Sequence, residues 1–142
     1  FAARGLNTVW PQCNRSTNHR AGTLRGLHWQ AEPHGEVKLV RVTRGRCWDV
    51  ALDLRPDSPT YRQYFGVELS AADALSFYIP VGMAHGFLTL EDDTEIFYMM
   101  GAAYAPGAGR GVRYDDPAFG IVWPAPVQVI SARDAGYPDF GG

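Results

Sequence analysis

The sequence predicts an all-β sandwich or barrel with little helix, built as one domain over residues 1–142. Its 16 glycines and 10 prolines are scattered along the chain, where they separate short segments rich in Val, Leu, Ile, Phe, Tyr and Thr. A chain of 142 residues is the size of one ordinary domain with one core. Seven segments are predicted to be strands: 23–30, 37–43, 46–54, 61–69, 75–79, 85–90 and 95–100. Only the stretch 70–74 indicates a helical turn.

The overall charge and the cysteines exclude several classes of protein. A net charge of −2 and a pI near 6.1 provide no broad positive field, so we expect no binding to a nucleic acid polymer, although a nucleotide remains possible as a small ligand. Cys13 and Cys47 have no CxxC spacing and are too few for a disulfide scaffold or a structural zinc site. No apolar segment is long enough to span a membrane, and no signal peptide is visible. We therefore expect a soluble, cytoplasmic protein.

The strand predicted at 23–30 places a histidine beside a glycine. Alternation along the strand puts four side chains on one face: Leu24, Gly26, His28 and Gln30. Because a glycine inside a strand permits close approach of a ligand or of another backbone, His28 is a candidate for the wall of a cavity. The alternative is a structural histidine that is satisfied by local contacts.

The segments 37–43 and 46–54 are predicted to form a hairpin around Gly45, because glycine accepts the positive φ of a tight turn. Pairing Thr43 with Arg46 places six residues on one face: Lys38, Val40, Val42, Cys47, Asp49 and Ala51. The other face is expected to be the core between the sheets: Leu39, Trp48, Val50, Leu52 and Leu54. In this register Lys38 and Asp49 are diagonal neighbours within side-chain reach. The alternative is a solvated ion pair on an outer face.

The stretch 79–87 has the order PxGxxHxF, which resembles the second conserved motif of cupins. In metal-binding cupins the first motif supplies HxH and a glutamate, whereas the corresponding place here reads His28-Trp29-Gln30. A metal site would therefore need an unusual ligand, and no metal is expected. A metal-dependent cupin enzyme is kept as an alternative, with these ligands: His28, His34, Glu36 and His85.

A set of ordered motifs carries a more specific resemblance. The motifs are Gly22-Thr-Leu-Arg-Gly-Leu-His28, Lys38-Leu-Val-Arg41, Asp49-Val-Ala-Leu-Asp-Leu-Arg55, Ser58-Pro-Thr60, Gly66-Val-Glu-Leu-Ser70, the stretch 79–87, and Tyr114-Asp-Asp-Pro117 through Trp123-Pro124. In order and spacing they resemble the dTDP-4-dehydrorhamnose 3,5-epimerase family over nearly the whole chain. The resemblance implies a cupin jelly-roll barrel, or double-stranded β-helix. It also implies an isomerase without a cofactor, a nucleotide-linked sugar substrate of the dTDP type and a homodimer.

The resemblance implies four catalytic residues. His28, in the GLH motif, is expected to be the base that removes a proton from the sugar carbon, and Asp134 to orient it. Lys38 is expected to stabilise the enolate oxygen. Tyr98 is expected to return a proton from the opposite face, and its alternative is a core aromatic of the barrel. These roles predict inversion at C3, C5 or both carbons of a 4-keto-6-deoxy-hexose.

Six further residues match substrate-binding positions of the family: Arg25, Gln12, Asn14, Asp49, His85 and Tyr104. Arg25 matches a diphosphate-binding arginine, yet it points away from His28 in a flat strand. A bulge at Gly26, or a pocket completed across a dimer, would bring both side chains to one site.

The chain departs from the family in two places. Family members have a segment upstream of the position of Phe1, so either the chain is incomplete or it lacks an N-terminal strand. Met99 and Met100 occupy positions where many members have a lysine and a small polar residue. These departures bear on the identity of the substrate. A non-catalytic cupin that binds a sugar nucleotide is a further alternative.

Overall fold

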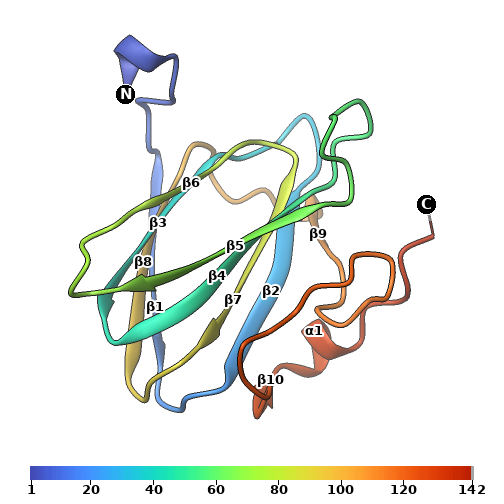
Figure 1. Ribbon diagram of the computed structural model, residues 1–142. Helices are drawn as coiled ribbons and strands as arrows, with labels where there is room; N and C mark the ends of the chain where they lie inside the picture. Colours follow the sequence, from blue (N-terminus) through green and yellow to red (C-terminus); the bar gives the residue numbers. More distant parts are fainter. Residues whose placement is uncertain (142) are drawn as a thin grey trace.

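Two β-sheets packed face to face form the protein in the computed structural model, which describes residues 1–141 (Figure 1). The first sheet contains, in spatial order, β1 (Gln12–Asn18), β8 (Thr94–Met100), β3 (Lys38–Arg44) and β6 (Phe77–Ile79). The second contains β10 (Val129–Ile130), β2 (Thr23–Gln30), β7 (Met83–Thr89), β4 (Arg46–Asp53) and β5 (Tyr64–Ser70), and β9 (Gly109–Gly111) also pairs with β2. The helical elements are the short η1 (Ala2–Arg4) and α1 (Ala132–Ala135). The predicted all-β class with little helix is confirmed.

Each of the seven predicted segments overlaps a strand, and β2 has the predicted bounds. The strands β1, β9 and β10 were not predicted. The sequence of β1 is QCNRSTN, and its burial alternates between intermediate and exposed along most of its length, so it has no run of apolar residues that would mark it as a strand. Residues 71–73 form a turn rather than a helix.

The predicted hairpin of residues 37–54 is wrong. β3 pairs with β8 and β6, whereas β4 pairs with β7 and β5 in the other sheet. Gly45, with a φ of +74°, lets the chain cross from one sheet to the other instead of folding back along the same sheet. Thr43 and Arg46 therefore do not pair, and Lys38 lies opposite Met100 and Ile79.

This crossover also exchanges the two predicted faces. The cluster between the sheets contains residues of both β3 and β4 from the face that was not assigned to the core: Val40, Val42, Cys47 and Ala51. Val50 and Leu52, from the predicted core face, lie in a second cluster with Trp48 and Leu54, where C-terminal residues such as Phe119 cover the outer side of the second sheet. The same alternation therefore places Lys38 and Asp49 inside the barrel, where both are buried.

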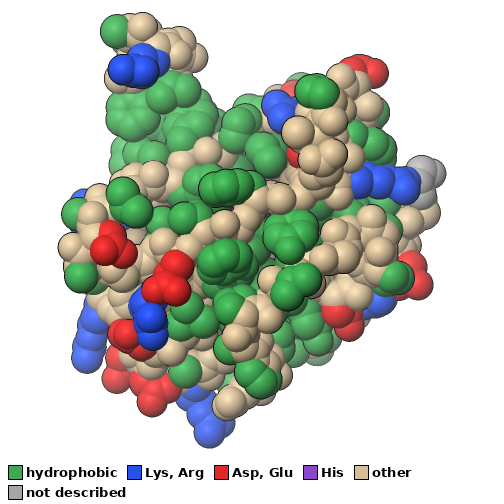
Figure 2. All heavy atoms as spheres, in the orientation of Figure 1, with side chains coloured by type: hydrophobic (Ala, Val, Ile, Leu, Met, Phe, Trp, Pro, Cys, Tyr) green, Lys and Arg blue, Asp and Glu red, His purple; other side chains and the backbone are tan. Residues whose placement is uncertain are grey.

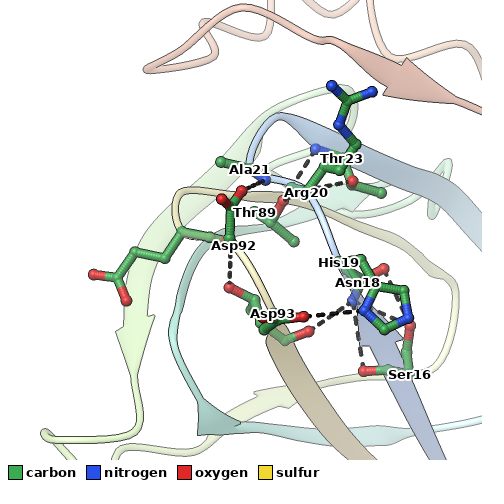
Figure 3. Close-up of polar contacts among 11 residues, drawn as sticks. Ser16, Asn18, His19, Arg20, Ala21, Thr23, Thr89, Asp92 and Asp93 are labelled. Atoms are coloured by element: carbon green, nitrogen blue, oxygen red, sulfur yellow. Dashed lines mark hydrogen bonds and ion pairs between the residues drawn. The ribbon is translucent and has the colours of Figure 1, made fainter.

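The loops at one end of the barrel bind one another through polar contacts (Figure 3). The backbone N–H of Ala21 donates to Asp92 Oδ1 over 2.7 Å, and His19 Nδ1 lies 3.0 Å from Asp93 Oδ1. The β1–β2 connection is thereby fixed to the β7–β8 connection. Asn18, at the end of β1, donates to Thr94 O, so its side chain has a fixed position close to the start of β2.

At the opposite end, the N-terminal segment projects from the barrel (Figure 1) and lies above a patch of hydrophobic side chains (Figure 2). The rings of Phe1, Trp10 and Tyr78 contact one another with centroid separations of 6.3 to 6.4 Å. Neither helical element within residues 1–141 has the length and apolar character needed to cross a membrane.

Candidate active site

A cavity of about 300 Å³ opens between the two sheets. Its lining comes from β1, β2, β3, β7, β8 and β9, from the segments that precede β3 and β9, and from α1. The lining includes nine of the ten residues proposed from the sequence: Gln12, Asn14, Arg25, His28, Lys38, His85, Tyr98, Tyr104 and Asp134. Asp49, the tenth, lies behind His85. The structure thus brings the sequence candidates together in one place.

His28 forms a close pair with Asp134, which lies 106 residues further along the chain. His28 Nε2 is 2.7 Å from Asp134 Oδ1, and the backbone N–H of Gly26 donates to Asp134 Oδ2 over 3.1 Å. The carboxylate is buried and sits in α1, whose first turn is capped by Ser131. When Nε2 carries the proton and donates it to this carboxylate, Nδ1 is the basic nitrogen of the ring.

The electrostatics of His28 suit a base. Burial lowers the pKa of His28 below its ordinary value of 6.5, and the carboxylate of Asp134 opposes part of this shift. The positive charge of Lys38 lowers the pKa of His28 further. The imidazole is therefore neutral at physiological pH and free to accept a proton.

Lys38 is buried, and its ammonium has two protein partners. Lys38 Nζ lies 3.2 Å from Glu36 Oε1 and donates to the carbonyl oxygen of His28 over 3.1 Å. Burial lowers the pKa of Lys38, while the charge and hydrogen bond of Glu36 raise it. Glu36 was considered from the sequence only as a metal ligand, and its role as the counter-ion of the lysine was not predicted. Its position two residues before Lys38 was the available signal.

Lys38 and Asp49 are not diagonal neighbours on one face as predicted, because β3 and β4 lie in different sheets. Asp49 instead contacts His85, whose Nε2 is 2.8 Å from Asp49 Oδ1. Both members of this second pair are buried, and Asp49 Oδ2 has no hydrogen-bond partner within residues 1–141. Asp49 acts on Lys38 only through space, where its charge raises the pKa of the lysine.

A bulge in β2 places Arg25 and His28 on the same cavity, as one of the two sequence alternatives predicted. The pairing of β2 with β7 changes register between these two residues. Gly26 has a φ of +110°, and a Cβ built on it would lie 2.6 Å from Gly86 Cα and from His85 O. Only glycine fits this close approach. Arg25 is oriented by Asn18, because Nε donates to Asn18 Oδ1 over 2.7 Å.

Tyr98 stands on the wall opposite His28, since β8 belongs to the first sheet and β2 to the second. It is partly buried, packs against the core between the sheets and lies opposite Asn14 in the pairing of β8 with β1. Burial raises the pKa of Tyr98, and the charge of Arg25 opposes this. The phenol is therefore protonated at physiological pH and available as a proton donor.

The rim of the cavity is polar and basic. Gln12 accepts a hydrogen bond from the backbone N–H of Tyr104 and donates to Asn14. Arg110 and Arg133 also line the cavity, and neither was predicted from the sequence. Together with Arg25 they give the cavity a local positive charge in a chain whose net charge is −2, as binding of a phosphorylated ligand requires.

The four residues considered from the sequence as metal ligands do not form a metal-binding group. Within the part of the chain that the structure describes, no three His, Cys, Asp or Glu side chains form a group that could hold a metal ion. The Nε2 atoms of His28 and His85 each face a carboxylate, and His34 is exposed. Gln30, at the position of a missing cupin ligand, donates to Glu36 instead.

The sequence and the fold correspond to those of known proteins. A family model described as dTDP-4-dehydrorhamnose 3,5-epimerase matches residues 1–141. The dTDP-4-dehydrorhamnose 3,5-epimerase of Sinorhizobium fredii is 46% identical over 130 residues, which are 91% of this chain and 67% of that protein. The crystal structure of the enzyme from Bacillus anthracis with TDP and PPi bound has a TM-score of 0.94 at 37% identity, and the match covers 98% of this chain and 79% of that chain.

Two further solved structures contain sugar nucleotides. The epimerase from Legionella pneumophila, in complex with dTDP-4-keto-L-rhamnose, has a TM-score of 0.89 at 38% identity over 96% of this chain and 72% of that chain. A 3'-monoepimerase from Streptomyces bikiniensis, in complex with dTDP-quinovose, has a TM-score of 0.86 at 33% identity over 92% of this chain and 66% of that chain. These matches confirm the expected cupin jelly roll. The chain belongs to the dTDP-4-dehydrorhamnose 3,5-epimerase family and is an isomerase.

Proposed function

We propose that this protein epimerises a dTDP-linked 4-keto-6-deoxy-hexose, of the dTDP-4-dehydro-6-deoxyglucose to dTDP-4-dehydrorhamnose type, at carbons next to the ketone. The observation that carries the proposal is one cavity with the His28–Asp134 pair on one wall, Tyr98 on the opposite wall and the Lys38 ammonium beside the backbone of His28. The complex of the Legionella relative with dTDP-4-keto-L-rhamnose supports the substrate class.

The first step is removal of a proton from carbon by His28. The electron pair of the broken C–H bond moves into the bond to the carbonyl carbon, and the ketone oxygen becomes an enolate. Such protons are acidic only when the developing negative charge is stabilised, which a positioned cation in a cavity with little water does well. Lys38 supplies that cation, and Asp134 stabilises the protonated imidazole.

The second step is return of a proton from the other side of the sugar. The enolate carbon takes the phenolic proton of Tyr98, the C=O bond forms again, and the configuration is inverted because acceptor and donor stand on opposite walls. The phenolate and the imidazolium then return to their starting states by exchange with solvent. Every step uses side chains of this chain.

The basic part of the cavity binds the nucleotide end of the substrate in this proposal. Arg25, fixed by Asn18, binds the diphosphate, because guanidinium groups form charge-assisted hydrogen bonds with phosphate oxygens. Polar groups at the rim contact the nucleoside and sugar: Gln12, Asn14 and Tyr104. His85, backed by Asp49, contacts the sugar.

The proposal covers inversion at C3, at C5 or at both carbons. The Bacillus and Legionella relatives are named as 3,5-epimerases and the Streptomyces bikiniensis relative as a 3'-monoepimerase. Both outcomes use the same proton chemistry, and they differ in whether the sugar turns in the cavity between two rounds.

Proton exchange with solvent tests the proposal directly. The protein is incubated with dTDP-4-keto-6-deoxyglucose in D₂O, and NMR measures the deuterium at C3 and C5. We expect incorporation at C3, at C5 or at both carbons. His28→Ala is expected to abolish incorporation, whereas His19→Ala, at an exposed histidine paired with Asp93, serves as the control and exchanges normally. Tight binding of the sugar nucleotide without any exchange would identify a non-catalytic binding protein. Exchange by His28→Ala at the native rate would contradict the assignment of the base.

We also propose that the protein is a homodimer. Two features support it: β1 is an edge strand of the first sheet, and the segment before it exposes apolar side chains, with Phe1 57% and Val9 66% exposed. Exposed apolar surface next to an edge strand favours association with a second chain. Light scattering after size-exclusion chromatography is expected to give twice the mass of 15.6 kDa.

A further inference from the structure

Lys38 is the only lysine in the sequence, and the other 12 of the 13 basic residues are arginines. It lines the cavity and is only 9% exposed. An ammonium has three N–H donors, and two of them have partners among the described residues: Glu36 Oε1 at 3.2 Å and His28 O at 3.1 Å. The third donor is left for a ligand in the cavity.

Glu36 is itself held in place by Gln30. The amide nitrogen of Gln30 donates to Glu36 Oε2 over 3.2 Å and also reaches the carbonyl oxygens of His34 and Ala103. The Gln30 side-chain oxygen accepts a hydrogen bond from the backbone N–H of Ala105. Gln30 is 5% exposed, so this amide is fixed at both ends. The carboxylate of Glu36 therefore has one oxygen on the lysine and the other on a rigid anchor.

We infer that Glu36, anchored by Gln30, is a positioning residue that keeps the Lys38 ammonium charged and in place for the reaction. The inference rests on the proposed function, because the charge matters only if Lys38 faces a developing enolate. A buried ammonium without a counter-ion tends to lose its proton. A neutral amine would stabilise the enolate oxygen far less than an ammonium does.

No other carboxylate replaces Glu36 among the described residues near Lys38. The titratable groups close to the ammonium or lining the same cavity include Glu36, His28, Asp49, His85, Tyr98 and Asp134. Asp134 is engaged by His28, and Tyr98 is a neutral phenol. Asp49 is engaged by His85 and acts on the lysine only through space. Two of the remaining groups are imidazoles, which do not neutralise a cation. Direct pairing therefore depends on Glu36.

Three variants distinguish the effect of the charge of Glu36 from the effect of its shape. Glu36→Gln keeps the size and one acceptor but removes the charge, Glu36→Asp restores a carboxylate on a shorter side chain, and Gln30→Leu removes the anchor. Glu68→Gln is the matched control, because it removes a carboxylate from the surface pair with Arg46. We expect Glu36→Gln to lower kcat about tenfold or more with a small change in KM, partial recovery in Glu36→Asp, and a smaller loss in Gln30→Leu. The control keeps wild-type kcat and KM.

A second readout does not depend on turnover. Because the chain has one lysine, labelling of lysine with ¹³C and ¹⁵N gives a single side-chain signal whose pH titration follows Lys38. We expect the titration midpoint of Lys38 to move to lower pH in Glu36→Gln and to stay unchanged in Glu68→Gln. An unchanged titration together with unchanged kcat would overturn the inference. A rise in KM with unchanged kcat would also overturn it, since Glu36 would then be a substrate contact.

The two readouts also separate this inference from the proposed function. If the wild-type protein exchanges no protons of a 4-keto sugar nucleotide, the proposed function fails, while the lysine titration still shows whether Glu36 keeps Lys38 charged. If the wild-type protein turns over and Glu36→Gln matches it in kcat and lysine titration, the function stands and the role of Glu36 is wrong.

Discussion

Nε2 of His28 lies 2.7 Å from Oδ1 of Asp134, although the two residues are 106 positions apart. The docking of α1 against β2 creates this contact, and the second carboxylate oxygen accepts a hydrogen bond from the backbone of Gly26. The aspartate is therefore fixed by the bulge that also turns the histidine toward the cavity. The imidazole and its carboxylate partner form one structural unit.

Asp134→Asn is expected to lower kcat by about 100-fold, because the amide neither stabilises the imidazolium nor selects the reactive tautomer. Deuterium incorporation into the sugar measures the loss. Asp93→Asn is the control, since it changes a similar contact to His19 on the surface. Equal exchange rates in Asp134→Asn and the wild type would show that the pair has no catalytic role.

The activity is expected to fall on the acid side with a midpoint below pH 6.5. The base acts in its neutral form, and burial lowers the pKa of His28 from its ordinary value of 6.5. The rate therefore rises as the pH passes upward through the lowered pKa. Because Asp134 raises the pKa of His28, its removal is expected to move this limb to still lower pH. The pH profile of kcat/KM measures both effects.

Tyr98→Phe is expected to separate exchange from inversion. His28 still removes and returns a proton on its own face, so deuterium incorporation continues, while formation of the inverted sugar falls by about 100-fold. NMR of the product in D₂O distinguishes the two. Tyr78→Phe is the matched control, because Tyr78 lies outside the cavity lining and contacts Asn7. Equal losses of exchange and inversion in Tyr98→Phe would contradict a donor role on the opposite face.

Gly26→Ala is expected to destabilise the protein by more than about 2 kcal/mol, because the added Cβ would overlap the backbone of β7. Gly107 also has a positive φ, of +85°, but a Cβ there meets nothing within 4 Å. Gly107→Ala therefore isolates the cost of the backbone conformation, about 1 kcal/mol. Chemical denaturation measures both variants. Equal stabilities would show that the β2–β7 contact tolerates a side chain.

The sequence was informative about strands with apolar alternation and uninformative about how they are connected. β2 was predicted with its observed bounds, whereas the polar strand β1 was missed. Arg44-Gly45 is compatible both with a hairpin and with a crossover between sheets, because a positive φ is needed in either case. Which of the two forms depends on whether β3 pairs with β4 or with β8. The local sequence does not contain that information.

The site was predicted largely through the resemblance to the epimerase family. Periodicity by itself placed His28 on a candidate cavity wall, but nothing local connects it to Asp134. Glu36 was missed as the partner of Lys38 because the hairpin register offered Asp49 instead. Because β3 and β4 lie in different sheets, the carboxylate that pairs with Lys38 is that of Glu36, two residues before it in the same segment.

The placement of His28 and Tyr98 on separate sheets has a mechanical consequence. The distance between the two side chains depends on the spacing of the sheets, which is set by a layer of core side chains such as Val40, Val42 and Ile96. A change of volume in this layer alters the reach of both groups to a bound ring without touching either of them. The rate of epimerisation therefore depends on the volume of the side chains between the sheets. We expect a well-folded variant with larger side chains in this layer to bind the sugar but to invert it slowly.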